Sequence, residues 1–169
     1  MNSEYSGKSY QVLCFKVDSY QFALELIELT AVTRVLEITP VQGSPKFFDG
    51  VITLRGQATP VLNLRTFFGL PPVKIDSASR LLTVYREKIQ LSLLADCLVG
   101  ISHIQLSDAQ PTPEILFNSF IKKVGKTSEG WVFFLDVHRL VSRHDMLAVV
   151  EKRVTPALSD LQEGVNNHD

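Results

Sequence analysis

The sequence predicts an all-β protein with short helices, made of two related β units. Strand-forming runs rich in Val, Ile, Leu and Phe follow one another along most of the chain, separated by short turns. Residues 59–68 (TPVLNLRTFF) and 131–140 (WVFFLDVHRL) both pass from an apolar strand, through Asn63 or Asp136, into a few residues with helical potential. Each follows a Gly-containing hairpin, and small β units hide their edges best by curling into barrels. We therefore expect two small barrels in one chain.

The expected elements follow in order from the N-terminus. Strands at 11–17 and 21–26 flank a turn at 18–20, and residues 27–36 predict a short helix that leads into a strand. The next strands are expected in a hairpin between 48 and 64, in a hairpin that turns near 86–88 with a further strand up to 106, and in a hairpin that turns at 127–130. Pro- and Ser-containing loops at 39–48, 71–79 and 107–116 separate them. Beyond Asp136, apolar residues at mostly helical spacing predict a C-terminal helix and then a polar tail.

Asn63 and Asp136 are expected to begin the two short helices. Asn and Asp are about equally good N-caps, because a side-chain oxygen accepts a hydrogen bond from a free backbone N–H of the first turn. Arg65 would then lie in the first turn of the first helix.

The stretch GVITLRGQATPVLNLR, residues 50–65, alternates apolar and polar side chains and has Arg55 and Gly56 in its middle. If one face is buried, a three-residue loop at 55–57 pairs Leu54 with Ala58 and lets both strands bury the same side. Leu54 would then lie in the core, and Arg55 would stand at an exposed tip.

Composition limits the function classes. The chain has 169 residues, 45% of them hydrophobic, which suits a folded core, and a net charge of -1, which provides no large field of one sign for nucleic acid. The polar N-terminus lacks the features of a secretory signal, and no apolar run is long enough to span a bilayer. We expect a cytoplasmic protein without direct membrane insertion.

Catalytic, cofactor and metal sites are not expected. Cys14 and Cys97 lie in apolar runs without paired spacing, so both are interpreted as buried thiols. The four histidines are scattered, and the nearest two, His138 and His144, are six residues apart, unlike the four-residue spacing of a helical metal pair.

The motifs now assembled resemble the CheW family of chemotaxis coupling proteins. The family has a Gly-Val-Ile-Asn-Leu-Arg-Gly run, then Pro-Val, Asp-Leu-Arg and Gly-Leu-Pro, and this chain has GVITLRG at 50–56, PVLNLR at 60–65 and GLP at 69–71. LSLLAD at 91–96 and FFLDVHRL at 133–140 are similar to two further family elements. Asn63 stands where the family usually has Asp, and equal capping ability predicts little cost.

The resemblance covers roughly residues 9–142 and implies a single CheW-like domain, followed by a C-terminal helix and tail at 143–169. It implies two five-stranded, SH3-like β-barrels packed around a shared core, with approximate subdomains at 9–72 and 80–142. It further implies a non-enzymatic adaptor, recruited to receptor arrays at the membrane, that binds the cytoplasmic tip of methyl-accepting chemoreceptors and the regulatory domain of a CheA-type histidine kinase. The partner-binding positions carried over are Val32, Arg34 and Arg55, with Gly56 and Gln57 beside the last. Arg34 stands where family members often have Glu, so either the receptor partner is atypical or Arg34 faces water.

Two alternatives remain open in the sequence. The chain could be a CheW-like scaffold of a non-flagellar pathway, such as one for type IV pili, or a paralogue that competes for kinase sites. In a different class, small barrels bind single-stranded nucleic acid through basic grooves and stacked aromatics. Lys122, Lys123 and Lys126 cluster on one predicted hairpin, where a solvated edge that blocks strand pairing is the simpler interpretation.

Overall fold

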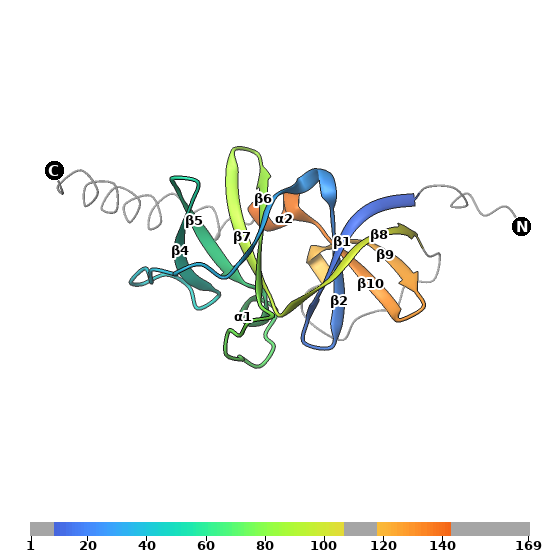
Figure 1. Ribbon diagram of the computed structural model, residues 1–169, viewed down its shortest axis with the longest axis horizontal. Helices are drawn as coiled ribbons and strands as arrows, with labels where there is room; N and C mark the ends of the chain where they lie inside the picture. The colour runs from blue at the N-terminus through green and yellow to red at the C-terminus, as the bar shows by residue number, and fades with distance from the viewer. Residues whose placement is uncertain (1–8, 107–117, 143–169) are drawn as a thin grey trace, which may run out of the picture.

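Ten strands form two five-stranded sheets in the computed structural model, which describes residues 9–106 and 118–142 (Figure 1). Sheet A has, in spatial order, β8 (Cys97–Gln105), β1 (Ser9–Val17), β2 (Tyr20–Glu25), β10 (Gly130–Leu135) and β9 (Ile121–Thr127). Sheet B has, in spatial order, β3 (Leu29–Arg34), β6 (Arg80–Arg86), β7 (Ile89–Ala95), β5 (Gln57–Asn63) and β4 (Phe48–Leu54). The short helices are η1 (Leu26–Glu28), α1 (Leu64–Phe67), η2 (Asn118–Phe120) and α2 (Val137–Ser142). The predicted fold class, two five-stranded β units with short helices, is confirmed.

The two sheets have the same construction. Each contains one parallel pair, β2 with β10 in sheet A and β5 with β7 in sheet B, among antiparallel neighbours. Each is closed by a single bridge between its two edges: Leu106, just past β8, pairs with Gly125 of β9, and Thr39, after β3, pairs with Val51 of β4. The two related β units predicted from the sequence are therefore two closed sheets of the same construction.

The sheets do not follow the expected division into 9–72 and 80–142. Sheet B is continuous in sequence, from β3 to β7, whereas sheet A combines the N-terminal hairpin with β8, β9 and β10. The loop at 71–79 looked like a linker because of its Pro and Ser residues, but it joins two strands of sheet B. The chain changes sheet instead between β2 and β3 and between β7 and β8.

Three apolar clusters explain why many strands are apolar on both faces. Each sheet encloses a small cluster of its own, around Phe134 in sheet A and around Ile52 in sheet B. A larger shared core between the sheets contains Phe15 and Phe22 from sheet A together with Phe68 and other residues beside sheet B. Phe22 and Phe68 stack with ring centroids 5.4 Å apart, so aromatic packing joins the two units directly.

The predicted three-residue loop at 55–57 is wrong. Leu54 pairs with Gln57, which leaves a two-residue turn of Arg55 and Gly56 with positive φ values of 51° and 77°, as in a type I′ turn. The prediction assumed one buried face, but Val51 packs in the shared core and Ile52 in the interior of sheet B, so both faces of β4 are buried. Burial therefore does not select the register that we expected, and Leu54 is only partly buried.

Other local expectations are confirmed. Asn63 Oδ1 accepts from the N–H of Thr66 at 3.3 Å at the start of α1, and Asp136 Oδ1 accepts from the N–H of Arg139 at 3.0 Å at the start of α2. The short helix before a strand at 27–36 corresponds to η1 and β3. The expected C-terminal helix and tail at 143–169 lie outside the described residues.

The two cysteines differ from each other. Cys14 is buried, as expected, and burial raises the pKa of its thiol. Cys97, at the start of β8, is only partly buried, so the prediction of two buried thiols is wrong for this residue.

Candidate partner-binding surface and inter-sheet junctions

The five residues predicted to bind partners all belong to sheet B and are all exposed. Val32 and Arg34 lie on β3, which is an edge strand, and the other three, Arg55, Gly56 and Gln57, form the tip of the β4–β5 hairpin. On β3 the side chains alternate between partly buried and exposed, so Val32 and Arg34 share the exposed face. We call these five residues the sheet B surface.

Two guanidinium groups on the sheet B surface have no internal partner. Among the described residues, neither Arg34 nor Arg55 makes a hydrogen bond or an ion pair with another side chain or with the backbone. Each is attached to backbone that the sheet holds in place, so only the side chain loses conformational entropy when the guanidinium binds an acidic group. These two arginines are therefore suited to an acidic partner surface.

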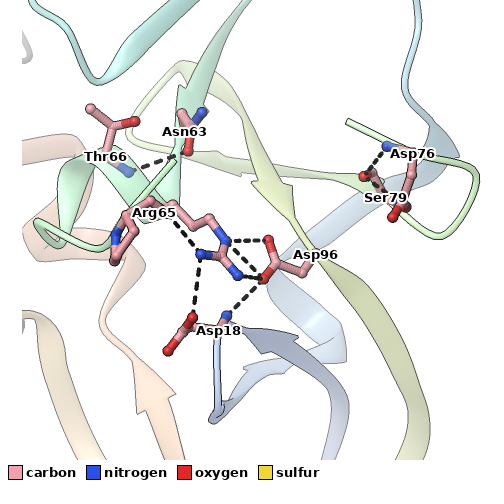
Figure 2. A network of polar contacts seen from close by, with 8 residues as sticks. Asp18, Asn63, Arg65, Thr66, Asp76, Ser79 and Asp96 are labelled. Atoms are coloured by element: carbon pink, nitrogen blue, oxygen red, sulfur yellow. Dashed lines mark hydrogen bonds and ion pairs between the residues drawn. The ribbon is translucent and has the colours of Figure 1, made fainter. Parts of the chain in front are cut away.

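Away from this surface, a polar cluster surrounds the point where the chain passes from sheet B to sheet A. Asp96 is the single residue between β7 and β8, and its carboxylate accepts two bonds from Arg65 Nε, at 3.0 and 2.9 Å (Figure 2). Arg65 Nη2 lies 2.7 Å from Asp96 Oδ2, and Arg65 Nη1 lies 3.3 Å from Asp18 Oδ1. Asp18, in the β1–β2 turn, closes the triangle by donating its backbone N–H to Asp96 Oδ2 at 2.7 Å. We call Arg65, Asp96 and Asp18 the Arg65 junction.

The Arg65 junction is more than a surface ion pair. The Arg65 side chain is only 12% exposed, and its hydrogen bond to Asp96 raises the pKa of the guanidinium above its usual value. Arg65 Nη1 also donates to the Pro71 carbonyl at 2.7 Å, and the backbone N–H of Asp96 donates to the Lys16 carbonyl at 3.0 Å. Exposed pairs contribute about 0–1 kcal/mol and breaking a buried pair costs about 3–5 kcal/mol, so we expect an intermediate cost of about 1–3 kcal/mol on loss of Arg65.

A second cluster surrounds the other passage between the sheets. The segment from β2 to β3 carries Glu25 and Glu28, and Lys122 of β9 forms ion pairs with both, with Nζ 3.0 Å from Glu28 Oε1. Burial lowers the pKa of Lys122, but the hydrogen bonds and charges of the two glutamates outweigh burial, and the pKa is raised. Burial is the largest single influence on Glu25 and raises its pKa, but the hydrogen bond and charge of Lys122, the charge of Lys123 and a bond from Glu28 together outweigh burial, and the pKa is lowered. We call Lys122, Glu25 and Glu28 the Lys122 junction.

The lysines of β9 are not a free basic groove. Lys122 is held by its two glutamates, Lys123 Nζ lies 3.9 Å from the ring centroid of Tyr10, and Lys126 Nζ lies 5.0 Å from that of Trp131. Side chains already used in this way are poorly placed for phosphate groups, so the structure gives no support to the nucleic-acid interpretation.

The described part of the chain contains neither a candidate metal site nor a candidate membrane-spanning helix. Within residues 9–106 and 118–142, no group of three or more His, Cys, Asp or Glu side chains could hold a metal ion. No helix in those ranges is long and apolar enough to cross a membrane.

Comparison with known proteins identifies the family. The model of the CheW-like domain matches residues 11–145, which is most of the chain. The chain belongs to the CheW-like domain family. Its relatives include the chemotaxis protein CheW of Thermotoga maritima, 26% identical over 137 residues that cover 79% of this chain and 89% of that protein. The chemotaxis protein CheW of Treponema pallidum is 19% identical over 83% of this chain and 87% of that protein.

The fold agrees with this family. The crystal structure of the scaffolding protein TtCheW from Thermoanaerobacter tengcongensis matches with a TM-score of 0.73 and 21% identity, over 82% of this chain and 96% of that one. The sequence-based identification as a CheW-like, non-enzymatic chemotaxis scaffold is confirmed at the level of the family.

Both junctions were missed by sequence reasoning, although their residues were partly visible. Arg65 ends the PVLNLR motif and Asp96 ends the LSLLAD motif, so two family motifs terminate in opposite charges. That pattern could have predicted a contact. Lys122, by contrast, looked like one member of a basic cluster, and only the register of β9 beside the β2–β3 passage shows its glutamate partners.

Proposed function

We propose that this chain couples transmembrane chemoreceptors to a histidine kinase of the CheA type in the cytoplasm. The sheet B surface would bind the cytoplasmic tip of the receptor, and another part of the molecule would bind the regulatory domain of the kinase. Membership of the CheW-like family supports the adaptor role, and relatives across most of the chain are named as chemotaxis proteins.

The observation that carries the receptor assignment is the pair of guanidinium groups, Arg34 and Arg55, which have no polar partner within residues 9–106 and 118–142 and lie on the exposed sheet B surface. Arginine is enriched among the residues that dominate binding energy at interfaces, and two exposed positive charges select an acidic partner. Val32, also on β3, would add an apolar contact with the receptor, since its side chain is 42% exposed.

The test is a reconstituted assay of kinase activity with a receptor cytoplasmic fragment, a CheA-type kinase and this chain. Asn tolerates positive φ well, so Arg55→Asn removes the guanidinium without straining the turn. Lys88→Asn is the matched control, because Lys88 also has positive φ, 66°, in the turn of the neighbouring β6–β7 hairpin.

We expect Arg55→Asn and Arg34→Gln each to weaken receptor-dependent kinase control at least about fivefold, as for an interface residue worth about 1 kcal/mol or more. The effect should diminish as ionic strength rises, because the contact is electrostatic. Unchanged coupling in the double variant, with wild-type thermal unfolding, would remove the sheet B surface from the receptor assignment.

The pathway depends on which kinase responds. A flagellar chemotaxis pathway and a non-flagellar one, such as a pathway for type IV pili, use the same kind of adaptor. The Arg65 junction and the Lys122 junction do not discriminate between the two pathways. A pull-down that uses this chain as bait for each candidate kinase would separate the two pathways. If the chain binds a kinase but does not place that kinase under receptor control, the result would favour a paralogue that competes for kinase sites.

A further inference from the structure

Within the described residues, the chain crosses from one sheet to the other at only two places, between β2 and β3 and between β7 and β8. We call these two connecting segments the passages. The chain leaves sheet A through η1, three residues long, and returns from sheet B through the single residue Asp96. Such short passages act as hinges, because a change in a few backbone dihedral angles there would turn one sheet relative to the other.

Each of the two passages is held by a basic side chain from elsewhere in the fold. At the first, Lys122 reaches from β9 of sheet A to Glu25, the last residue of β2, and to Glu28, the last residue of η1. At the second, Arg65 reaches from α1, beside sheet B, to Asp96 and to Asp18 in sheet A. The two junctions come from unrelated sequence segments, yet both place two carboxylates and one cation at a change of sheet.

The shared apolar core would not by itself fix the orientation of the sheets. Apolar burial is non-directional, so the stacking of Phe22 on Phe68 specifies the orientation of the sheets less strictly than a hydrogen-bonded ion pair does. A guanidinium that makes parallel bonds to a carboxylate has a fixed geometry, here Arg65 Nε with Asp96 Oδ1 and Nη2 with Oδ2, and the Arg65 junction adds a third bond from the Asp18 backbone. Directional constraints between the sheets therefore lie in the two junctions and in the contacts of Glu87, in the β6–β7 turn, with His138 and Ser142 of α2.

Surfaces suited to protein contact occur on both sheets. In sheet B these are the five residues of the sheet B surface, and in sheet A the strand β8 exposes Val99 and Ile101, which are 44% and 63% exposed. An adaptor that held one partner on each sheet would need a defined angle between the two sheets.

We propose that Arg65 and Lys122 are positioning residues, which fix the relative orientation of the two sheets and so transmit receptor state to the kinase. This inference rests on the proposed adaptor function, because coupling requires two partners to be held at once. The two residues touch neither partner. They act through the passages at Asp96 and at η1.

The orientation is measured without any partner. Spin labels at Thr53→Cys on β4 and Ser102→Cys on β8, both exposed positions, report the distance between the sheets by pulsed electron paramagnetic resonance. Cys97→Ser removes the partly buried native thiol, and Cys14 is too buried to be labelled. The test variants in this background are Arg65→Met and Lys122→Met, which keep much of the apolar stem and remove the charge.

Two controls remove a cation of the same type away from the passages. Lys126→Met lies on the same strand as Lys122 and removes a contact within the β9–β10 hairpin. Arg80→Met removes an arginine whose Nη1 donates to the carbonyls of Ser77 and Ser79, close in sequence. We expect the test variants to shift or broaden the distance distribution and the controls to leave it unchanged. An unchanged distribution in both test variants, with the fold intact by circular dichroism, overturns the proposal.

The second measurement is kinase control in the reconstituted receptor assay. We expect each test variant to bind receptor fragment and kinase domain separately with affinities within about threefold of wild type, since distant sites act independently. Receptor control of the kinase should fall at least about fivefold, the lower end of typical coupling between sites. Arg65→Lys, which keeps the charge but not the planar geometry, should restore part of the control.

The outcomes separate the two proposals. A shifted distance with unchanged kinase control overturns the claim that the orientation fixed by Arg65 and Lys122 transmits receptor state to the kinase. Failure of the wild-type chain to bind any CheA-type kinase or receptor fragment overturns the proposed function instead, while the label distances still decide whether the junctions orient the sheets.

Discussion

The substitution Asn63→Asp tests how this chain departs from its family at the first helix cap. Asn63 Oδ1 caps α1 by accepting from the N–H of Thr66, and a carboxylate can do the same. The other end of the amide has a second role, because Nδ2 donates to the Asp49 carboxylate, at 3.1 Å from Oδ2 and 3.4 Å from Oδ1. A carboxylate at position 63 would face Asp49 without a proton to donate. The expectation that Asn and Asp are equivalent here considered only the cap.

The cost follows from two losses. A hydrogen bond to a charged group contributes about 1.5–3 kcal/mol, and two like charges about 4 Å apart repel by up to about 4 kcal/mol at an effective dielectric constant near 20. Burial already raises the pKa of Asp49 and the bond from Asn63 opposes that effect, so the variant loses the opposing bond and Asp49 takes up a proton more readily. Proton uptake limits the repulsion, and we expect Asn63→Asp to lower the free energy of unfolding by about 2–4 kcal/mol at pH 7.

Urea unfolding at pH 7 and pH 5 measures this cost. A carboxyl pair whose pKa is raised in the folded state loses stability at neutral pH and regains it as pH falls through that raised pKa, so the variant should be closer to wild type at pH 5. Adding Asp49→Asn restores a donor opposite the new carboxylate and should recover most of the loss. Asp136→Asn, at the equivalent cap of α2, is the matched control and should change stability by less than about 1 kcal/mol. An effect of Asn63→Asp below about 0.5 kcal/mol at pH 7, or a larger effect at pH 5, would refute the reasoning.

Three further predictions concern the packing and the junctions. Gly50→Ala should prevent closure of sheet B and destabilise by several kcal/mol or abolish folding, since a Cβ would lie 2.1 Å from the Thr39 carbonyl oxygen at a φ of 142°; a wild-type melting curve would contradict this. Phe68→Ala should cost about 3–5 kcal/mol in chemical unfolding, because the side chain is only 2% exposed in the shared core, and a cost below about 1 kcal/mol would show loose packing there. Glu25 has a lowered pKa because the hydrogen bond and charge of Lys122, with smaller contributions from Lys123 and Glu28, together outweigh burial, so its stabilisation is present at neutral pH and lost as pH falls through the folded pKa. Glu25→Gln should therefore be less stable than wild type at pH 7, with a difference that shrinks as the pH is lowered, and a difference that stays constant or grows on acidification would contradict the assignment.

Much of the fold was predictable from local sequence. The order of strands and short helices, the two capped helices and the internal duplication follow from strand-forming runs, turn residues and the positions of Asn63 and Asp136. These are local properties, since a cap and a turn depend on a few adjacent residues. The exposed tip at Arg55 was predicted for the same reason, although the loop length was wrong.

The errors concern properties that only the assembled sheets determine. The hairpin register was wrong because β4 buries Val51 toward the other sheet and Ile52 inside its own, and a sequence does not state how many faces a strand buries. The division into subdomains differs from the two sheets because strand pairing is non-local: β1 and β2 pair with strands from the second half of the chain. For the same reason the contact between Arg65 and Asp96, 31 residues apart, was visible only as two motif endings.

The motifs that show family membership serve mainly to build the two-sheet structure. Gly50 allows the close approach of Thr39, Asn63 caps α1, and Arg65 and Asp96 form a junction between the sheets. Among the motif positions, Arg55 carries an exposed charge that has no internal polar partner among the described residues. A change at the structural positions should thus alter stability or sheet orientation with any partner, whereas under the proposed function partner choice would depend on exposed residues outside the motifs, such as Arg34. Exchanging β3 with that of a relative, while keeping the junctions, should change which receptor is coupled without changing the orientation measured between the sheets.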